Sequence, residues 1–212
     1  MSCFPVATEP RGLRAADTPS SAAAPVQAVW LLAGSAGATA AVQRFLGAFR
    51  RRPPVAFLYA QHYDPLRQDQ LRHLSSPSPL FHMGLIEERH ALLAGEVLIV
   101  PPRWRIGIGA DAVWAEREQP WTTGGHSPDI DELEVLLAAA RLPARGLILF
   151  SGMGRDGAGN LDVLDTTGCR LWVQQPASAV CRGMPEAAIA SGLVHRSATP
   201  ELLATALEQL YD

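Results

Sequence analysis

A serine, a histidine and an aspartate, three residue types that cooperate in hydrolysis, each come shortly after an apolar run of the sequence. They are Ser35, His62 and Asp156. A serine hydroxyl becomes a nucleophile when a histidine takes its proton and a carboxylate orients that histidine. The chemistry that these residue types predict is acyl transfer to water through an acyl-serine intermediate.

Ser35 lies in the short sequence Ala33-Gly34-Ser35-Ala36-Gly37, between an apolar run and a helical pattern. Small neighbours allow the tight strand-to-helix turn that lifts a nucleophile above a sheet, although Ala33 stands where the usual pattern has glycine. The N–H groups at the start of the helix would face any negative charge that develops beside the serine. The alternative is that Ser35 only caps or precedes this helix.

The elements that must position these residues alternate between short apolar strands and helices, which predicts a doubly wound α/β fold. We expect a mostly parallel sheet with helices on both faces, in three layers, and an antiparallel hairpin at the sheet edge. Strands are expected at 28–32, 55–60, 97–100, 106–108, 112–115, 144–150 and 169–175, and helices at 38–50, 66–74, 130–142, 161–166, 183–190 and 202–210.

Ser35, His62 and Asp156 all follow predicted strands, and ligands of open α/β sheets bind at the carboxyl ends of the strands. We therefore expect the three side chains to meet at one edge. Taken singly, each has another explanation: His62 could bond to loop backbone, and Asp156 could cap the helix that follows it. The shared edge favours a triad in which His62 takes the Ser35 proton and Asp156 orients the imidazole.

The stretch after the strand at 144–150 also matches a dinucleotide-binding fingerprint, with Gly152, Gly154 and Gly157 between a strand and a helix. Two features count against this alternative. Asp156 would bring a carboxylate to the pyrophosphate, and Gln174 and Gln175 stand where an acid should meet the ribose. The glycines also permit a sharp turn that exposes backbone N–H groups around Asp156.

Composition limits the class of protein. The 212 residues suit one domain, and the net charge of −3 argues against nucleic-acid binding, although all 18 basic residues are arginine. Three cysteines without close spacing indicate neither a disulfide framework nor a metal site. No secretory signal or membrane-spanning run is found. We expect a cytoplasmic protein that needs no cofactor or metal and does not insert into membranes.

Four segments together resemble the catalytic domain of the CheB-type chemotaxis methylesterases. They are the serine turn at 32–39, Gln61-His62, the glycine-rich segment at 152–158, and Gly183-Met184-Pro185 with the residues up to Ile189. The resemblance covers roughly residues 28–211 and implies a doubly wound α/β domain that hydrolyses glutamate γ-methyl esters on chemoreceptors and often deamidates receptor glutamines.

By the same resemblance, the family's triad falls on Ser35, His62 and Asp156, and its methionine beside the oxyanion site falls on Met153. Ala36 and Gly154 complete the predicted oxyanion or substrate pocket. The chain departs from the family pattern in having Ala36 where a threonine hydroxyl is usual. It also lacks a histidine in the segment 100–105, and it has Pro128-Asp129-Ile130-Asp131 for Pro-Ser-Val-Asp.

We interpret residues 1–27 as a flexible tail or linker and 28–212 as the catalytic domain. Because 27 residues cannot form a receiver domain, we expect no control by phosphorylation in cis. The expected partner is the cytoplasmic domain of a methylated chemoreceptor, while the sequence does not give the oligomeric state. Two alternatives remain open: a drifted domain that docks receptors in a chemosensory or pilus-linked pathway, and an esterase for small metabolites. Activity should fall as His62 becomes protonated.

Overall fold

The computed structural model describes residues 26–63, 75–121 and 127–212. Its centre is a seven-stranded parallel sheet in the order β10-β9-β8-β1-β2-β5-β3. These strands are β1 Ala28–Gly34, β2 Val55–Gln61, β3 His82–Leu85, β5 Glu96–Ile99, β8 Arg145–Leu149, β9 Arg170–Gln174 and β10 Arg196–Ala198. The predicted doubly wound α/β fold is confirmed.

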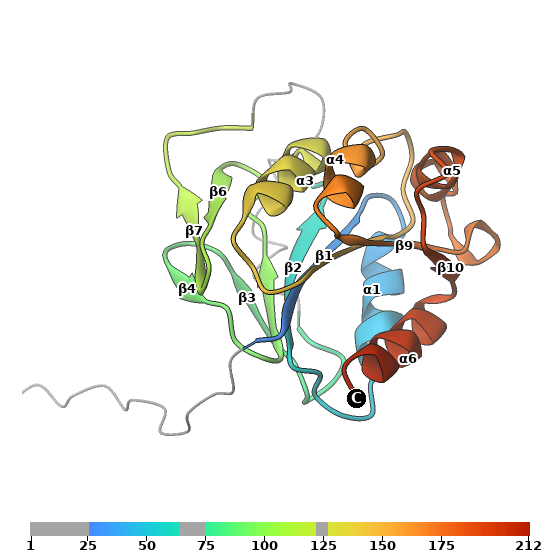
Figure 1. The fold of residues 1–212 in the computed structure, drawn as a ribbon, viewed down its shortest axis with the longest axis horizontal. Coiled ribbons are helices and arrows are strands. Elements are labelled where there is room, and N and C mark those ends of the chain that lie inside the picture. Colours follow the sequence, from blue (N-terminus) through green and yellow to red (C-terminus); the bar gives the residue numbers. More distant parts are fainter. Residues whose placement is uncertain (1–25, 64–74, 122–126) are drawn as a thin grey trace, which may run out of the picture.

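Helices cover both faces of the sheet (Figure 1). On one face lie α1 and α6, and on the other α3, α4 and α5. Their bounds are α1 Ala38–Gly47, α3 Ile130–Ala139, α4 Leu161–Thr166, α5 Gly183–Ala190 and α6 Pro200–Leu210, and a 3₁₀ turn, η2, spans Pro176–Ser178. The sheet is therefore the middle of three layers.

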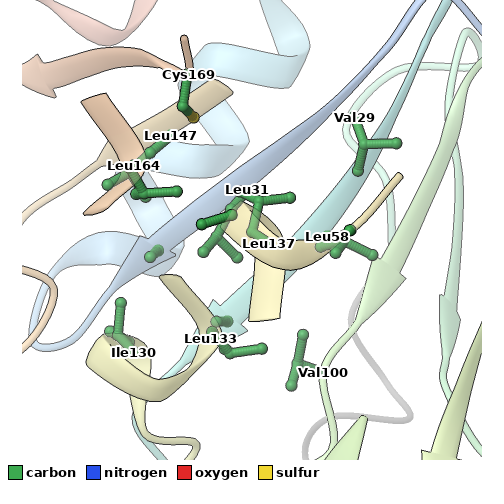
Figure 2. Close-up of a cluster of buried hydrophobic side chains, with 14 of the residues drawn as sticks. Val29, Leu31, Leu58, Val100, Ile130, Leu133, Leu137, Leu147, Leu164 and Cys169 are labelled. Atoms are coloured by element: carbon green, nitrogen blue, oxygen red, sulfur yellow. The ribbon is translucent and has the colours of Figure 1, made fainter. Parts of the chain in front are cut away.

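Strand β1 is buried along its whole length, and its alternate side chains feed two separate cores. Leu31 points to the face of α3 and α4 and lies beside Leu137, in a core cluster that also contains Leu133 and Leu164 (Figure 2). Trp30 points to the opposite face, where it packs with the residues of α1 and α6. A strand covered on both sides needs a continuous apolar sequence, which is why this run could be identified from the sequence.

The predicted hairpin forms, but its placement at the edge of the main sheet was wrong. Strands β6 Arg105–Ile108 and β7 Ala112–Glu116 pair antiparallel, and β4 His90–Ala91 joins them in a separate three-stranded sheet. The edges of the main sheet are the parallel strands β3 and β10. The sequence pattern identified the hairpin but carried no information about which sheet its outer edge would join.

Other predicted boundaries shift by a few residues. The first helix ends at Gly47 and α3 ends at Ala139, before the expected residues, whereas α6 begins at Pro200, before the expected Leu202. The predicted helix at 66–74 and residues 1–25 of the predicted tail at 1–27 lie outside the described residues. In the part of the chain that the structure describes, no helix has the length and apolar character needed to cross a membrane.

Candidate active site

The candidate site lies at the carboxyl ends of three neighbouring central strands, β8, β1 and β2. Ser35 directly follows β1, His62 directly follows β2, and Asp156 lies in the segment after β8. In the sheet, β2 lies on one side of β1 and β8 lies on the other. The direction in which successive strands are added to the sheet therefore reverses at β1. Such a switch point is where open α/β sheets form their ligand sites.

The turn at Ser35 is as tight as its small residues predict. A Cβ on Gly34 would lie 2.4 Å from the Cβ of Ala38, and Gly37 has a left-handed φ of 83°. Gly37, not Ser35, is the N-cap of α1, and no side chain caps this helix end. The Ser35 hydroxyl makes no hydrogen bond to a described residue, so a role as a helix cap does not explain it.

The backbone places Ser35 beside His62. Gly34 and Gln61 are partners in the parallel register of β1 and β2, and the His62 N–H donates to the Gly34 carbonyl at 3.1 Å. The residues that follow this pair therefore leave the sheet side by side. Neighbouring strands are about 4.8 Å apart, which brings a serine and a histidine side chain within reach of each other.

His62 and Asp156 are in direct contact, although 94 residues separate them in the chain. The His62 Nε2 lies 2.6 Å from the Asp156 Oδ2, and the two side chains are only 9% and 15% exposed. Asp156 also accepts the backbone N–H groups of Ile130 at 3.1 Å and Asp131 at 2.9 Å, both in the first turn of α3. Its carboxylate is thus held between an imidazole and a helix N-terminus.

Burial acts to raise the pKa of Asp156, but the hydrogen bonds outweigh this effect. The bonds from His62 and from the N–H groups of Asp131 and Ile130 favour the carboxylate, so the pKa lies below its ordinary value of 3.8. Asp156 is therefore ionised at neutral pH. An ionised carboxylate on Nε2 keeps the proton on that nitrogen and leaves Nδ1 as the basic nitrogen of the ring.

Gln61 joins the serine and histidine turns, a role that the sequence did not indicate. Its buried side-chain amide donates to the Ser35 carbonyl at 2.7 Å and to the His62 carbonyl at 3.4 Å. The Tyr59 hydroxyl donates to the Gln61 Oε1 at 3.0 Å and so fixes the orientation of the amide. In the sequence, only the position of Gln61 next to His62 could have indicated this role.

Ser151 holds a second junction, and its role was also missed. Its buried hydroxyl donates to the carbonyl of Ala36 at 2.7 Å and accepts the Cys181 N–H at 2.9 Å. The Ser151 carbonyl accepts the Ser35 N–H at 2.9 Å. One residue shortly after β8 therefore connects the serine turn to the segment before α5.

Of the predicted pocket residues, Ala36 directly follows Ser35, and Met153 and Gly154 belong to the segment after β8 that approaches the serine turn at Gly152. A Cβ on Gly152, next to Met153, would lie 3.0 Å from the Ser35 Cβ. Among the described residues, no acceptor takes the backbone N–H of Ala36, Met153 or Gly154. The side chain of Met153 is 66% exposed. These N–H groups can therefore donate to a bound molecule.

Packing explains two of the three glycines of the dinucleotide-like fingerprint, whereas Gly154 has open space around it and a positive φ of 83°. A Cβ on Gly152 would collide with the sulfur of Met184 at 1.9 Å, and one on Gly157 would meet Leu149 and Ile130 below 3.0 Å. Asp156 does not cap the helix that follows it, whose N-cap is Asn160. It instead binds the N-terminus of α3, a helix that precedes it in the sequence.

Two residues that depart from the family pattern lie on neighbouring elements of the fold: Asp129 at the start of α3, and Arg105 in the strand β6. Asp129 is the N-cap of α3 and accepts the Glu132 N–H at 2.8 Å, as expected for an acid at a helix start. Arg105, at the position that lacks the family's histidine, forms an ion pair with Glu132. This pair ties β6 to the helix whose N-terminus holds Asp156.

Fold and site together define a three-layer α/β domain that gathers a serine, a histidine and an aspartate at the carboxyl edge of a parallel sheet. The family model of the CheB methylesterases matches residues 30–207. The chain belongs to this family.

Curated relatives agree with this assignment. The chain is 32% identical over 210 residues to protein-glutamate methylesterase/protein-glutamine glutaminase 3 of Anaeromyxobacter dehalogenans, covering 98% of this chain and 61% of the relative. It is 30% identical to the protein-glutamate methylesterase FrzG of Myxococcus xanthus, covering 85% of this chain and 54% of the relative. The chain thus spans about half to three fifths of the length of these relatives.

A solved structure has the same fold. The catalytic domain of the Thermotoga maritima CheB methylesterase matches with a TM-score of 0.72 at 17% identity, covering 86% of this chain and 97% of that domain. At this level of identity the match supports the architecture alone. It agrees with the α/β fold described above.

Proposed function

We propose that this chain hydrolyses glutamate γ-methyl esters on the cytoplasmic domain of a chemoreceptor, and that the same site deamidates receptor glutamines. The observation that carries the proposal is the 2.6 Å contact between His62 and Asp156 beside the turn of Ser35. Membership of the CheB methylesterase family and the names of the relatives support the substrate class.

In this mechanism Ser35 attacks the carbonyl carbon of the ester while His62 takes the hydroxyl proton. Because Asp156 contacts Nε2, we assign the base role to Nδ1 of His62. The ionised Asp156 stabilises the imidazolium that forms and does not itself take up the proton.

The tetrahedral intermediate then collapses. Its oxyanion is stabilised by backbone N–H groups, for which Ala36, Met153 and Gly154 are the candidates. The imidazolium gives its proton to the leaving methoxide, methanol departs, and Ser35 remains acylated by the glutamyl side chain. A water molecule, deprotonated by His62, attacks the acyl-serine; the imidazolium then returns this proton to the departing Ser35 oxygen, and the free glutamate is released. With a glutamine substrate, the same steps release ammonia.

We propose that the reaction takes place in the cytoplasm, where the chain would reach the receptor segment that carries the methyl esters. The two described cysteines, Cys169 and Cys181, are free thiols, which agrees with a reducing compartment. No bound metal or cofactor takes part in the proposed steps.

A second candidate function is a receptor-docking domain with weak or no turnover. One observation favours it: the Ser35 hydroxyl has no hydrogen-bond partner among the described residues. Catalytic hydrogen bonds are often long in the absence of substrate and tighten when substrate binds. The two candidates therefore differ in whether substrate brings Ser35 and His62 together.

Methanol release from a methylated receptor fragment separates the two candidates. The wild type should release methanol, Ser35→Ala should release none while still binding the fragment, and Ser197→Ala, a change at an exposed serine, should match the wild type. Receptor binding without methanol release by the wild type would favour the docking domain. Comparable turnover of small acyl esters and receptor ester would instead indicate a metabolite esterase.

A further inference from the structure

Asp131, in the first turn of α3, makes more contacts with the segment that carries Asp156 than any helix cap requires. Its Oδ1 accepts the backbone N–H of Gly157 at 2.7 Å and of Gly159 at 2.9 Å. A Cβ on Gly159 would lie 2.4 Å from the Asp131 Oδ2. The carboxylate therefore occupies the inside of the turn that begins at Gly157, and the turn closes tightly around it.

The backbone of Asp131 binds the same segment from both sides. Its N–H donates to the Asp156 Oδ1 at 2.9 Å, and its carbonyl accepts the Asn160 side-chain amide at 2.8 Å. Donor, acceptor and side chain of one residue thus all bond to the segment 156–160. A shift of Asp131 would move the Asp156 carboxylate together with the turn.

The position of Asp156 matters because its two oxygens serve different neighbours. Oδ1 bonds to the Asp131 N–H, while Oδ2 contacts His62 and also accepts the Ile130 N–H. Fixing one oxygen on α3 determines the direction in which the other oxygen faces the imidazole. The Asp131 side chain then prevents the segment from turning away, because it accepts hydrogen bonds from the N–H groups of Gly157 and Gly159.

The cluster contains several like charges, and this makes a role in stability alone a poor explanation. Asp129 and Asp156 both lie close to Asp131, and burial together with the neighbouring carboxylates raises the pKa of Asp129. An asparagine at position 131 would offer the same Oδ1 acceptor without the repulsion. The carboxylate forms charge-assisted hydrogen bonds, which hold the turn more firmly than neutral ones.

We propose that Asp131 is a positioning residue that fixes the turn 157–160 on α3 and thereby holds Asp156 in contact with His62. It touches neither substrate nor the reacting atoms and acts only through Asp156. The role in catalysis rests on the proposed methylesterase activity, whereas the contact itself can be tested without any substrate.

The test compares Asp131→Ala, which removes the acceptor, with Asp131→Asn, which keeps it. Methanol release from the methylated receptor fragment should show kcat lowered about 100-fold in the alanine variant, the loss expected for a catalytic group misplaced by about 1 Å. KM should change little, because Asp131 does not contact substrate. The asparagine variant should recover most of kcat. Asp162→Asn, at an exposed acid in the first turn of α4, should match the wild type.

A spectroscopic measurement keeps the proposal falsifiable even if the wild type releases no methanol. The short hydrogen bond at His62 Nε2 should give an imidazole N–H proton signal far downfield in the wild type and in Asp131→Asn. That signal should move upfield or broaden in folded Asp131→Ala. An unchanged signal in folded Asp131→Ala would overturn the proposal whatever the activity. A wild-type kcat in Asp131→Ala would also overturn the proposal, provided that Ser35→Ala abolishes methanol release and so confirms the methylesterase activity.

Discussion

The His62 Nε2 and the Asp156 Oδ2 lie 2.6 Å apart, in an environment that excludes most solvent from both side chains. This contact joins the end of β2 to the segment after β8, on either side of the strand that carries Ser35. The N-terminus of α3 supplies two further hydrogen bonds to the same carboxylate. Asp156 is thus prepared to orient and stabilise a histidine before any substrate arrives.

Replacing Asp156 by asparagine should lower kcat by about four orders of magnitude, because an amide favours the wrong tautomer of the histidine. It should also destabilise the fold at neutral pH. The folded pKa of Asp156 lies below 3.8, so the unfolded chain binds this proton more tightly than the folded chain does. The stability from Asp156 is therefore present above about pH 4 and is lost as pH falls through the lowered pKa.

Denaturant unfolding of the wild type and Asp156→Asn between pH 2 and pH 7 measures this contribution. The difference in the free energy of unfolding should be largest near neutral pH and should shrink on acidification. A difference that stays constant over the whole range would show that the ionised carboxylate does not stabilise the fold.

Adding one methyl group at Gly152 should damage the site more than the fold. Its Cβ would lie 1.9 Å from the Met184 sulfur and 3.0 Å from the Ser35 Cβ. The Met184 side chain is fully buried and cannot give way freely, so strain of about 1–3 kcal/mol is expected. Gly152→Ala should therefore lose methanol release, measured as kcat on the receptor fragment, and melt at a lower temperature.

Gly84→Ala provides the matched control, because a Cβ at Gly84 would meet no atom within 4 Å. It should keep wild-type activity and melting temperature. Equal activities of the two alanine variants would mean that the contact between Gly152 and the serine turn is not required.

Glu134 makes a second pH prediction, of opposite sign. It is fully buried, one of its oxygens has no hydrogen-bond partner among the described residues, and burial with the nearby Asp131 raises its pKa to about 9. The folded state thus binds this proton more tightly than the unfolded chain. Stability from this group is complete below about pH 4.5 and falls by about 1.4 kcal/mol per pH unit as pH rises toward 9.

Glu134→Gln should remove this slope, since an amide does not titrate. Urea unfolding between pH 5 and pH 9 would measure this difference. Relative to the wild type, the free energy of unfolding of Glu134→Gln should increase steadily as pH rises. Parallel pH dependences of the two proteins would show that Glu134 is already ionised in the folded state.

The location of the candidate residues was more predictable than the hydrogen bonds that support them. Ser35, His62 and Asp156 were predicted to share one edge because each follows an apolar strand and the carboxyl ends of parallel strands meet at the same edge, and the contact of His62 with Asp156 agrees with this placement. Gln61, Ser151 and Asp131 could not be assigned roles, because their partners are backbone groups elsewhere in the fold. The Ser151 hydroxyl, for example, bonds to Ala36, which is 115 residues away.

The hairpin shows that the fold, too, was only partly predictable, because β6 and β7 belong to a separate sheet and not to the edge of the main sheet. Alternating apolar residues and a glycine turn predicted β6 and β7 themselves. Their position depends on contacts across the chain, such as the pair of Arg105 with Glu132 on α3 and the pairing of β4 with β7. No local pattern encodes those contacts.

The most direct test of the triad is a double-mutant comparison of kcat/KM on the methylated receptor fragment, with Ser35→Ala, His62→Ala and the two changes combined. Residues that act as one unit lose function together, so the double variant should be no slower than Ser35→Ala alone. If the two losses instead multiply, Ser35 and His62 contribute independently, and the proposed transfer of the serine proton to His62 is contradicted.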